Sequence, residues 1–98
     1  MVEKLSEAER AKFFADHPAW EAAEGRDAAT RTFRFSGFAE AFGWMTRIAI
    51  EADKADHHPE WFNVYDRVEV TLTTHDADGL SARDAAMAAV MDAAYGAR

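Results

Sequence analysis

The fold is decided by residues 56–65, which read DHHPEWFNVY. This stretch ends a long helical pattern, and Pro59 then forces an extended path because proline disfavours helical geometry in the residue before it. Two adjacent histidines, His57 and His58, stand at this transition, and a third, His75, follows the next extended segment. If the two extended segments pair as a hairpin, the three imidazoles gather near one end of a sheet.

Four strands are predicted around this stretch, at residues 20–24, 30–35, 60–65 and 68–74. The last alternates strictly, with Val68, Val70 and Leu72 on one face, which is typical of a half-buried strand. The dipeptide Asp66-Arg67 is expected to connect the third and fourth strands, and Gly25-Arg26-Asp27 to connect the first two. Connections this short imply antiparallel pairing.

Three helices are predicted, beginning after the cap residues Ser6, Ser36 and Ser81 and ending near Asp16, Asp56 and Tyr95. The first and third begin with capping boxes, in which Glu9 or Asp84 returns a hydrogen bond to the cap residue. Gly96 fits a C-terminal stop for the third. On the long middle helix, the expected buried stripe is Phe38, Phe42, Met45, Ala49 and Ala52, flanked by Ala41 and Ile48, with Trp44 and Ile50 outside it.

The resulting order, helix-strand-strand-helix-strand-strand-helix, predicts an α+β fold. One face of the predicted sheet is apolar, so the three helices should cover that face. The expected architecture is a two-layer sandwich with a four-stranded antiparallel sheet. A length of 98 residues predicts a single domain over residues 1–98.

Composition excludes several classes of function. The chain has 11 Lys and Arg against 18 Asp and Glu, and the net charge of −7 disfavours binding to nucleic acid and to anionic membranes. It has no cysteine, so a disulfide framework, a thiolate metal site and a cysteine nucleophile are excluded. Residues 1–7 lack the apolar run of a signal peptide, and no stretch is long enough to span a bilayer, so a cytoplasmic location is expected.

The histidines are the candidates for chemistry. Imidazole both donates and accepts protons near neutral pH, so three of them around one cleft suggest general acid–base catalysis. Asp53 and Asp56 precede the histidine pair, and either could orient an imidazole, although a solvated helix end explains Asp53 equally well. Asp84 could cap its helix and still border the cleft.

A zinc site on the same histidines is the rival interpretation. Neighbouring side chains on an extended segment point to opposite faces, so His57 and His58 cannot easily bind one metal together. The sequence contains neither His-x-His nor His-x-x-x-His. No metal site is therefore predicted.

Aromatic side chains of the third strand offer a second kind of contact. Trp61, Asn63 and Tyr65 are expected on the strand face that points away from the core. There an aromatic ring could stack on a flat ligand, or it could equally lie in a subunit interface.

The same residues resemble the signature of the pterin-4a-carbinolamine dehydratases. The blocks that carry the resemblance are residues 53–65, 68–75 and 79–84, with further likeness at Trp20, 24–27 and 41–47. The resemblance covers roughly residues 20–95, and the histidine–proline block is its most specific part. Asp53 is a departure, because many members of the family carry glutamate there.

The resemblance implies a hydro-lyase, 4a-hydroxytetrahydrobiopterin dehydratase. Such an enzyme dehydrates 4a-hydroxytetrahydropterin to quinonoid dihydropterin and so recycles the tetrahydropterin cofactor of aromatic amino-acid hydroxylases. It needs no metal or other cofactor, since the pterin is its substrate. Family members form homodimers or homotetramers, and some animal members bind a homeodomain transcription factor.

The resemblance implies that His57, His58 and His75 surround the pterin, and from this we predict a set of site residues. The expected catalytic residues are His57, His58 and His75, with His57 and His75 as the acid–base pair and His58 holding the substrate. The expected substrate-binding residues are Asp56, Pro59, Trp61, Thr74, Asp76, Arg83 and Asp84. The main alternative is a non-catalytic adaptor or transcriptional coactivator on the same fold, and a third is a protein that binds pterin without turnover.

Overall fold

Four strands form one antiparallel sheet in the computed structural model, which describes residues 2–98. The strands are β1 (Glu21–Ala22), β2 (Ala29–Arg34), β3 (Glu60–Val64) and β4 (Arg67–Leu72). They lie in the order β1-β2-β4-β3, so β2 and β4 form the centre and β1 and β3 the edges. Both predicted hairpins are present, and the strand bounds differ from the expected ones by one or two residues.

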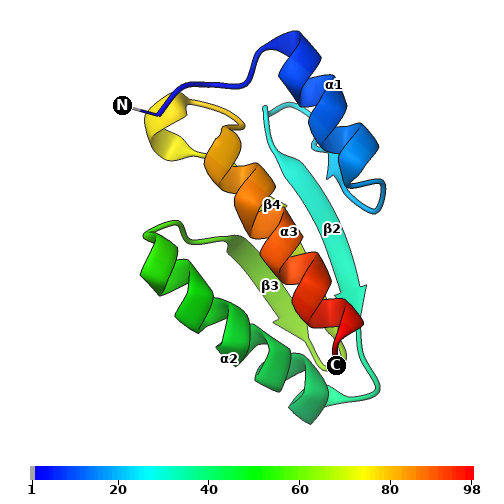
Figure 1. The fold of residues 1–98 in the computed structure, drawn as a ribbon. Coiled ribbons are helices and arrows are strands. Elements are labelled where there is room, and N and C mark those ends of the chain that lie inside the picture. The colour runs from blue at the N-terminus through cyan, green and yellow to red at the C-terminus, as the bar shows by residue number, and fades with distance from the viewer. Residues whose placement is uncertain (1) are drawn as a thin grey trace.

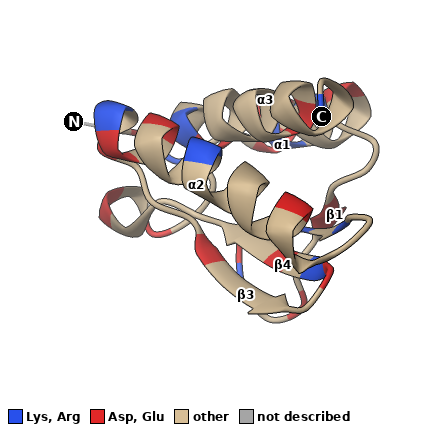
Figure 2. Cartoon of the chain, turned by 90° about the horizontal axis from the view of Figure 1, so that it is seen from below, with Lys and Arg blue, Asp and Glu red and all other residues tan. Residues whose placement is uncertain are grey.

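Three helices cover one face of this sheet (Figure 1). They are α1 (Glu7–Asp16), α2 (Phe38–Ala55) and α3 (Ala82–Gly96), and a short 3-10 helix, η1 (His75–Ala77), follows β4. Seen from below, the helices form one layer and the strands the other (Figure 2). The predicted α+β two-layer sandwich and its element order are therefore confirmed. No helix within residues 2–98 is long and apolar enough to cross a membrane.

The core lies between the two layers. The sheet contributes Phe33 and the alternating residues Val68, Val70 and Leu72 of β4, all buried as the sequence predicts. Ile48 of α2 packs against them, together with apolar residues of α3. Both predicted capping boxes are formed, so the first turns of α1 and α3 begin where the sequence places them.

The buried stripe of α2 differs from the predicted one. The buried residues are Ala41, Trp44, Ile48 and Ala52, whereas Phe38 and Phe42 are 51% and 54% exposed. The reason is tertiary: the Trp44 ring stacks on Phe33 of β2, with 4.4 Å between ring centroids, and this contact rotates the helix relative to the predicted stripe. Ile50 lies outside the stripe, as expected.

The ends of two helices also differ from prediction. The N-cap of α2 is Gly37, and Ser36 instead donates its backbone N–H to the Glu40 carboxylate over 2.9 Å. Gly96 is the last residue of α3 rather than a left-handed stop beyond it, because the chain continues to Ala97 in right-handed helical geometry.

The two faces of β3 are the reverse of the predicted ones. Trp61 pairs with Val70 and Asn63 with Val68, and paired residues in an antiparallel ladder share a face. Trp61 and Asn63 therefore point towards the helices and are half-buried, while Phe62 on the open face is 59% exposed. The connection to β4 is Tyr65-Asp66, one residue earlier than predicted, with Tyr65 in the left-handed region at φ 51°.

Candidate active site

The site begins where α2 ends. Asp56 caps the helix in the left-handed conformation, with φ 50°, and the chain then turns so that the His57 backbone N–H donates to the Ala52 carbonyl over 3.0 Å. This turn directs the His57 side chain inwards, where only 9% of it is exposed. His58 follows on the solvent side, so the two histidines contact different parts of the protein.

A buried carboxylate holds the His57 ring. The Nε2 atom of His57 lies 2.6 Å from Oδ1 of Asp84, which stands in the first turn of α3 and is completely buried. The other oxygen of Asp84 accepts hydrogen bonds from the Thr74 hydroxyl at 2.7 Å and from the Ser81 backbone N–H at 2.9 Å. Three donors thus satisfy this buried carboxylate, which is the condition for burying a charge.

The contact with Asp84 also selects a tautomer. An ionised carboxylate only accepts hydrogen bonds, so the proton of a neutral His57 ring lies on Nε2. The lone pair is then on Nδ1, which is the nitrogen able to take a proton from a ligand. Asp84 would offset the positive charge that the ring acquires in that step.

His58 has a weaker partner. Its Nε2 atom lies 2.9 Å from Oδ1 of Asp53, but the two side chains are 59% and 83% exposed. The sequence allowed two interpretations of Asp53, as a residue that orients an imidazole or as part of a solvated helix end. The structure shows that it contacts the imidazole of His58. Because both groups are open to water, the pair restrains His58 only loosely.

The three histidines line one polar hollow of about 260 Å³. His57 and His58 come from the end of α2, and His75 from η1 beyond β4, so the hairpin does bring them to one end of the sheet. Of the predicted substrate-binding residues, Asp56, Thr74, Asp76 and Arg83 line the same hollow. Glu60 and Thr73 line it as well, and the sequence did not single them out.

Three other predicted residues lie outside this lining. Asp84 lies behind His57 and contacts the ring of that histidine rather than the hollow itself. Pro59 connects His58 to β3 and sets the extended path. Trp61 packs against Trp44 beneath α2, with 6.3 Å between the centroids, because its strand face is the one that the helices cover.

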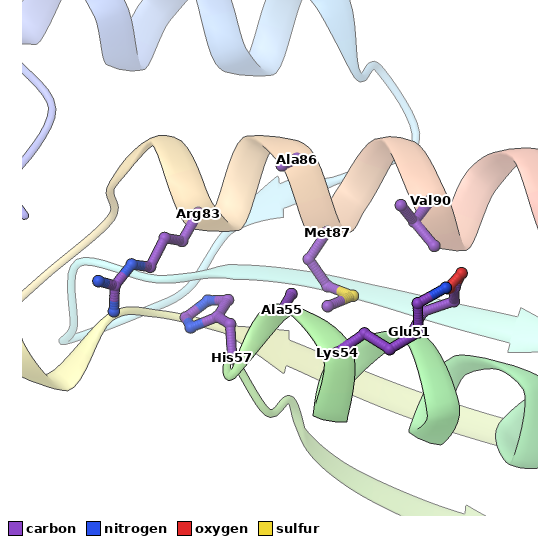
Figure 3. A pocket seen from close by; sticks show the side chains of 8 residues that line it. All are labelled: Glu51, Lys54, Ala55, His57, Arg83, Ala86, Met87 and Val90. Carbon is purple, nitrogen blue, oxygen red and sulfur yellow. The ribbon is translucent and has the colours of Figure 1, made fainter.

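A second hollow, of about 370 Å³, adjoins the first between α2 and α3. Figure 3 shows His57 and Arg83 at one end of it, and Met87 and Val90 of α3 opposite Lys54 of α2. His57 and Arg83 border both hollows. Its walls are largely apolar, with Ala55 and Ala86 completing the middle, whereas all three histidines border the polar hollow.

The polar hollow is suited to proton transfer around a small polar ligand. Imidazoles from two separate elements border it, and one of them is held by a buried carboxylate. Within residues 2–98, no three His, Asp or Glu side chains are grouped so that they could hold a metal ion. The fourth histidine, His17, lies elsewhere, with Nδ1 3.6 Å from the Asp92 carboxylate.

Comparisons with known proteins point to one family. A family model described as pterin 4 alpha carbinolamine dehydratase matches residues 3–94. A protein of Novosphingobium aromaticivorans, named as a candidate pterin-4-alpha-carbinolamine dehydratase, is 60% identical over 91 residues, covering 93% of this chain and 95% of the relative. A protein of Paraburkholderia xenovorans with the same name is 56% identical over 92 residues, covering 94% and 96%.

A solved structure has the same fold. The crystal structure of a transcriptional coactivator/pterin dehydratase from Brucella melitensis matches with a TM-score of 0.93 and 45% identity. The match covers 96% of this chain and 100% of that one.

Proposed function

Because the chain belongs to the pterin-4a-carbinolamine dehydratase family, we propose that it dehydrates a 4a-hydroxytetrahydropterin to the quinonoid dihydropterin. The C4a–O bond breaks, the hydroxyl leaves as water after gaining a proton, and a ring N–H gives up a proton. The observation that carries this proposal is the polar hollow bordered by His57, His58 and His75, with His57 held by a buried carboxylate.

The two proton transfers need two groups. Hydroxide is a poor leaving group, so an acid must protonate it as the bond breaks, and a base must collect the nitrogen proton. We assign the base to His57, because Asp84 directs its free nitrogen lone pair to Nδ1 and offsets the charge gained. His75, from the other side of the hairpin, is then the acid, and His58 holds the substrate.

Stopped-flow absorbance of carbinolamine decay, with and without the protein, tests this function. We expect the wild type to accelerate the decay, and His57→Ala and His75→Ala each to lower kcat by about 10²- to 10⁴-fold, the usual contribution of a positioned acid or base. His17→Ala is the matched control, since that imidazole lies outside the hollow. Unchanged kcat in both variants would remove the assignment.

We place this reaction in the cytoplasm, in the recycling of a tetrahydropterin cofactor for aromatic amino-acid hydroxylases, as the family resemblance implies. No cofactor beyond the pterin substrate is required by the two proton transfers. Coupling the protein to a purified hydroxylase tests this role: hydroxylation with catalytic tetrahydropterin and a dihydropterin reductase should run faster when the protein is present. An unchanged steady-state rate would contradict the recycling role.

We also propose that the chain forms a homodimer or homotetramer. Phe38, Phe42 and Ile50 expose large apolar side chains on α2, and β3 is an edge strand that exposes Phe62. Apolar groups gathered on one helix and an unpaired strand edge are features that subunit contacts cover. Light scattering during size exclusion should give a mass of two or four chains, and a monomer at micromolar concentration would contradict it.

A non-catalytic adaptor or transcriptional coactivator is the second candidate. It is favoured by the name of the Brucella melitensis protein and by the exposed apolar side chains of α2. An adaptor has no need of three imidazoles around a hollow, so we prefer the enzyme. Stoichiometric capture of one protein partner, together with no effect on carbinolamine decay, would reverse this preference.

A further inference from the structure

The loop that carries His75 is closed by its own backbone. Residues 75–78 lie between Thr74 and Gly79, whose backbone groups exchange two hydrogen bonds, of 2.9 and 3.2 Å. The other two histidines of the site each contact a carboxylate, whereas the His75 imidazole contacts none within residues 2–98. The position of the His75 ring therefore depends on how firmly this loop is attached to the rest of the domain.

One aspartate holds both ends of the loop. Asp27 lies in the turn between β1 and β2, next to the end of β4. Its backbone carbonyl accepts a hydrogen bond from the Thr73 hydroxyl, just before the loop, at 2.9 Å. Its Oδ2 atom accepts one from the Leu80 backbone N–H, just after the loop, at 3.2 Å. Asp27 thus attaches both ends of the His75 loop to the beginning of β2, across 46 and 53 positions of sequence.

Asp27 is itself fixed by its surroundings. Its Oδ1 atom accepts a hydrogen bond from Nε of Arg10 on α1 at 2.8 Å, and only 24% of the side chain is exposed. The carboxylate lies so close to Gly79 that a Cβ atom at that position would collide with it. The neighbouring residue Arg26 joins the same turn to the Glu60 carboxylate of β3 at 2.8 and 3.0 Å. The direction of the Asp27 carboxylate is therefore set by the protein alone.

The two histidines with roles in proton transfer are thus held in different ways. Asp84 contacts the His57 ring directly, and it also accepts a hydrogen bond from the Thr74 hydroxyl at 2.7 Å. The His75 ring has no such partner, so its loop has to be held through backbone groups. Asp27 does this from the side of the loop opposite Asp84, and it is not among the residues that line the polar hollow.

We propose that Asp27 is a positioning residue for His75, which it acts on by attaching both ends of the loop that carries this histidine. The inference rests on the proposed dehydratase function, in which His75 is the acid. Asp27 touches no reacting atom in this arrangement. The simpler interpretation is that Asp27 only attaches α1 to the sheet through Arg10, and the two differ in what the following variants should do.

The test variant is Asp27→Asn, with Asp92→Asn as its matched control. Asp92 also accepts hydrogen bonds from an arginine and from a second N–H group, and 28% of its side chain is exposed. An amide has one oxygen where the carboxylate has two. In Asp27→Asn this oxygen should stay with the charged Arg10, the stronger donor, so the Leu80 N–H loses its acceptor. Both variants should lose a similar amount of unfolding free energy.

Their effects on the reaction should differ. We expect Asp27→Asn to lower kcat by about 10- to 100-fold with KM nearly unchanged, because a misplaced acid slows the chemical step more than it weakens binding. Asp92→Asn should keep the kcat of the wild type. Amide hydrogen exchange at Ala77 and Asp78, whose N–H groups bond within the loop, should be about three- to tenfold faster in Asp27→Asn alone, the effect of one net hydrogen bond.

A double-mutant cycle shows whether Asp27 acts through His75. If it does, adding Asp27→Asn to His75→Ala will cause no further loss of kcat, because the group that it positions is already absent. A second variant, Arg10→Gln, removes the attachment to α1 but keeps the bond to Leu80, so its kcat should stay within about threefold of the wild type.

The outcomes separate the two proposals. The positioning role is overturned by a wild-type kcat in Asp27→Asn, by the same loss of kcat with and without His75, or by an equal loss in Arg10→Gln. Each of these results leaves the dehydratase function intact. Failure of the wild type to accelerate carbinolamine decay overturns the dehydratase function instead, and the exchange measurements then still show whether Asp27 holds the loop.

Discussion

The Nε2 atom of His57 lies 2.6 Å from Oδ1 of Asp84, although 27 positions separate the two residues. One residue follows the end of α2 and the other stands in the first turn of α3. Their contact joins the two helices beside the polar hollow, and under the proposed function it makes Asp84 a positioning residue for the base.

Replacing the Asp84 carboxylate by an amide should distinguish its role in positioning the His57 ring from the effect of its negative charge. Asp84→Asn keeps the side-chain shape, but the amide stabilises a protonated His57 less than a carboxylate does. We expect kcat to fall by about 10²-fold or more, with a changed pH–rate profile, because the base loses its counter-charge.

The matched control is Asp92→Asn, a second aspartate of α3 that contacts Arg31 and the Trp20 indole N–H instead. It should alter stability but leave the pH–rate profile unchanged. An identical profile in wild type and Asp84→Asn would show that Asp84 serves the helix alone.

The pair of His58 and Asp53 should matter much less. Both side chains are more than half exposed, so their contact at 2.9 Å is screened by water. We expect Asp53→Asn to change kcat and KM by less than about threefold, since a loss below 0.7 kcal/mol corresponds to roughly that factor. A tenfold rise in KM would show instead that Asp53 binds the substrate directly.

The two aromatic residues Trp44 and Phe42 should differ sharply in their effect on stability. Trp44 is 5% exposed and stacks on Phe33, so Trp44→Ala should cost about 3–5 kcal/mol of unfolding free energy in urea titrations. Phe42 is 54% exposed, so Phe42→Ala should cost less than about 1 kcal/mol within one chain.

Protein concentration provides the control for this comparison. If Phe42 lies in a subunit contact, Phe42→Ala will shift the assembly equilibrium and make the measured stability depend on concentration. Equal losses of unfolding free energy for Trp44→Ala and Phe42→Ala at every protein concentration would contradict the buried stripe that the structure shows on α2.

Acid should weaken the pair of Arg26 and Glu60. The hydrogen bonds from Arg26 lower the pKa of Glu60 below its ordinary value, so the unfolded chain binds this proton more readily than the folded one. The pair therefore stabilises the fold above the ordinary glutamate value of about 4.3, and this contribution is lost as the pH falls through the lowered value.

Urea titrations between about pH 3 and 6 measure this loss. The wild type and Glu60→Gln should converge in stability at the acid end and separate slightly above it, with the wild type more stable. The separation will be small, because both side chains are half exposed. A separation that grows towards low pH would have the wrong sign.

Local patterns were sufficient for much of this fold. The capping boxes at Ser6 and Ser81 are complete within four residues, and the alternation of β4 shows its buried face directly. The break at Pro59 located the histidine pair at the end of α2. These features depend on neighbours in the chain, which a sequence displays.

The features that the sequence did not predict correctly depend on contacts between residues that are far apart in the chain. Apolar residues are so frequent along α2 that several stripes fit its sequence, and the contact of Trp44 with Phe33 selects among them. The face of β3 follows from its register with Val68 and Val70. The pair of Arg26 and Glu60 joins residues 34 positions apart, and no local pattern points to it.

Asp84 closes the capping box of α3 and orients His57 with the same carboxylate. Fraying of that first helical turn would therefore release the imidazole at once, before the rest of the domain melts. Under the proposed function, inactivation on gentle warming should track local opening at Ser81 rather than global unfolding, so amide hydrogen exchange at this turn would report on catalytic competence.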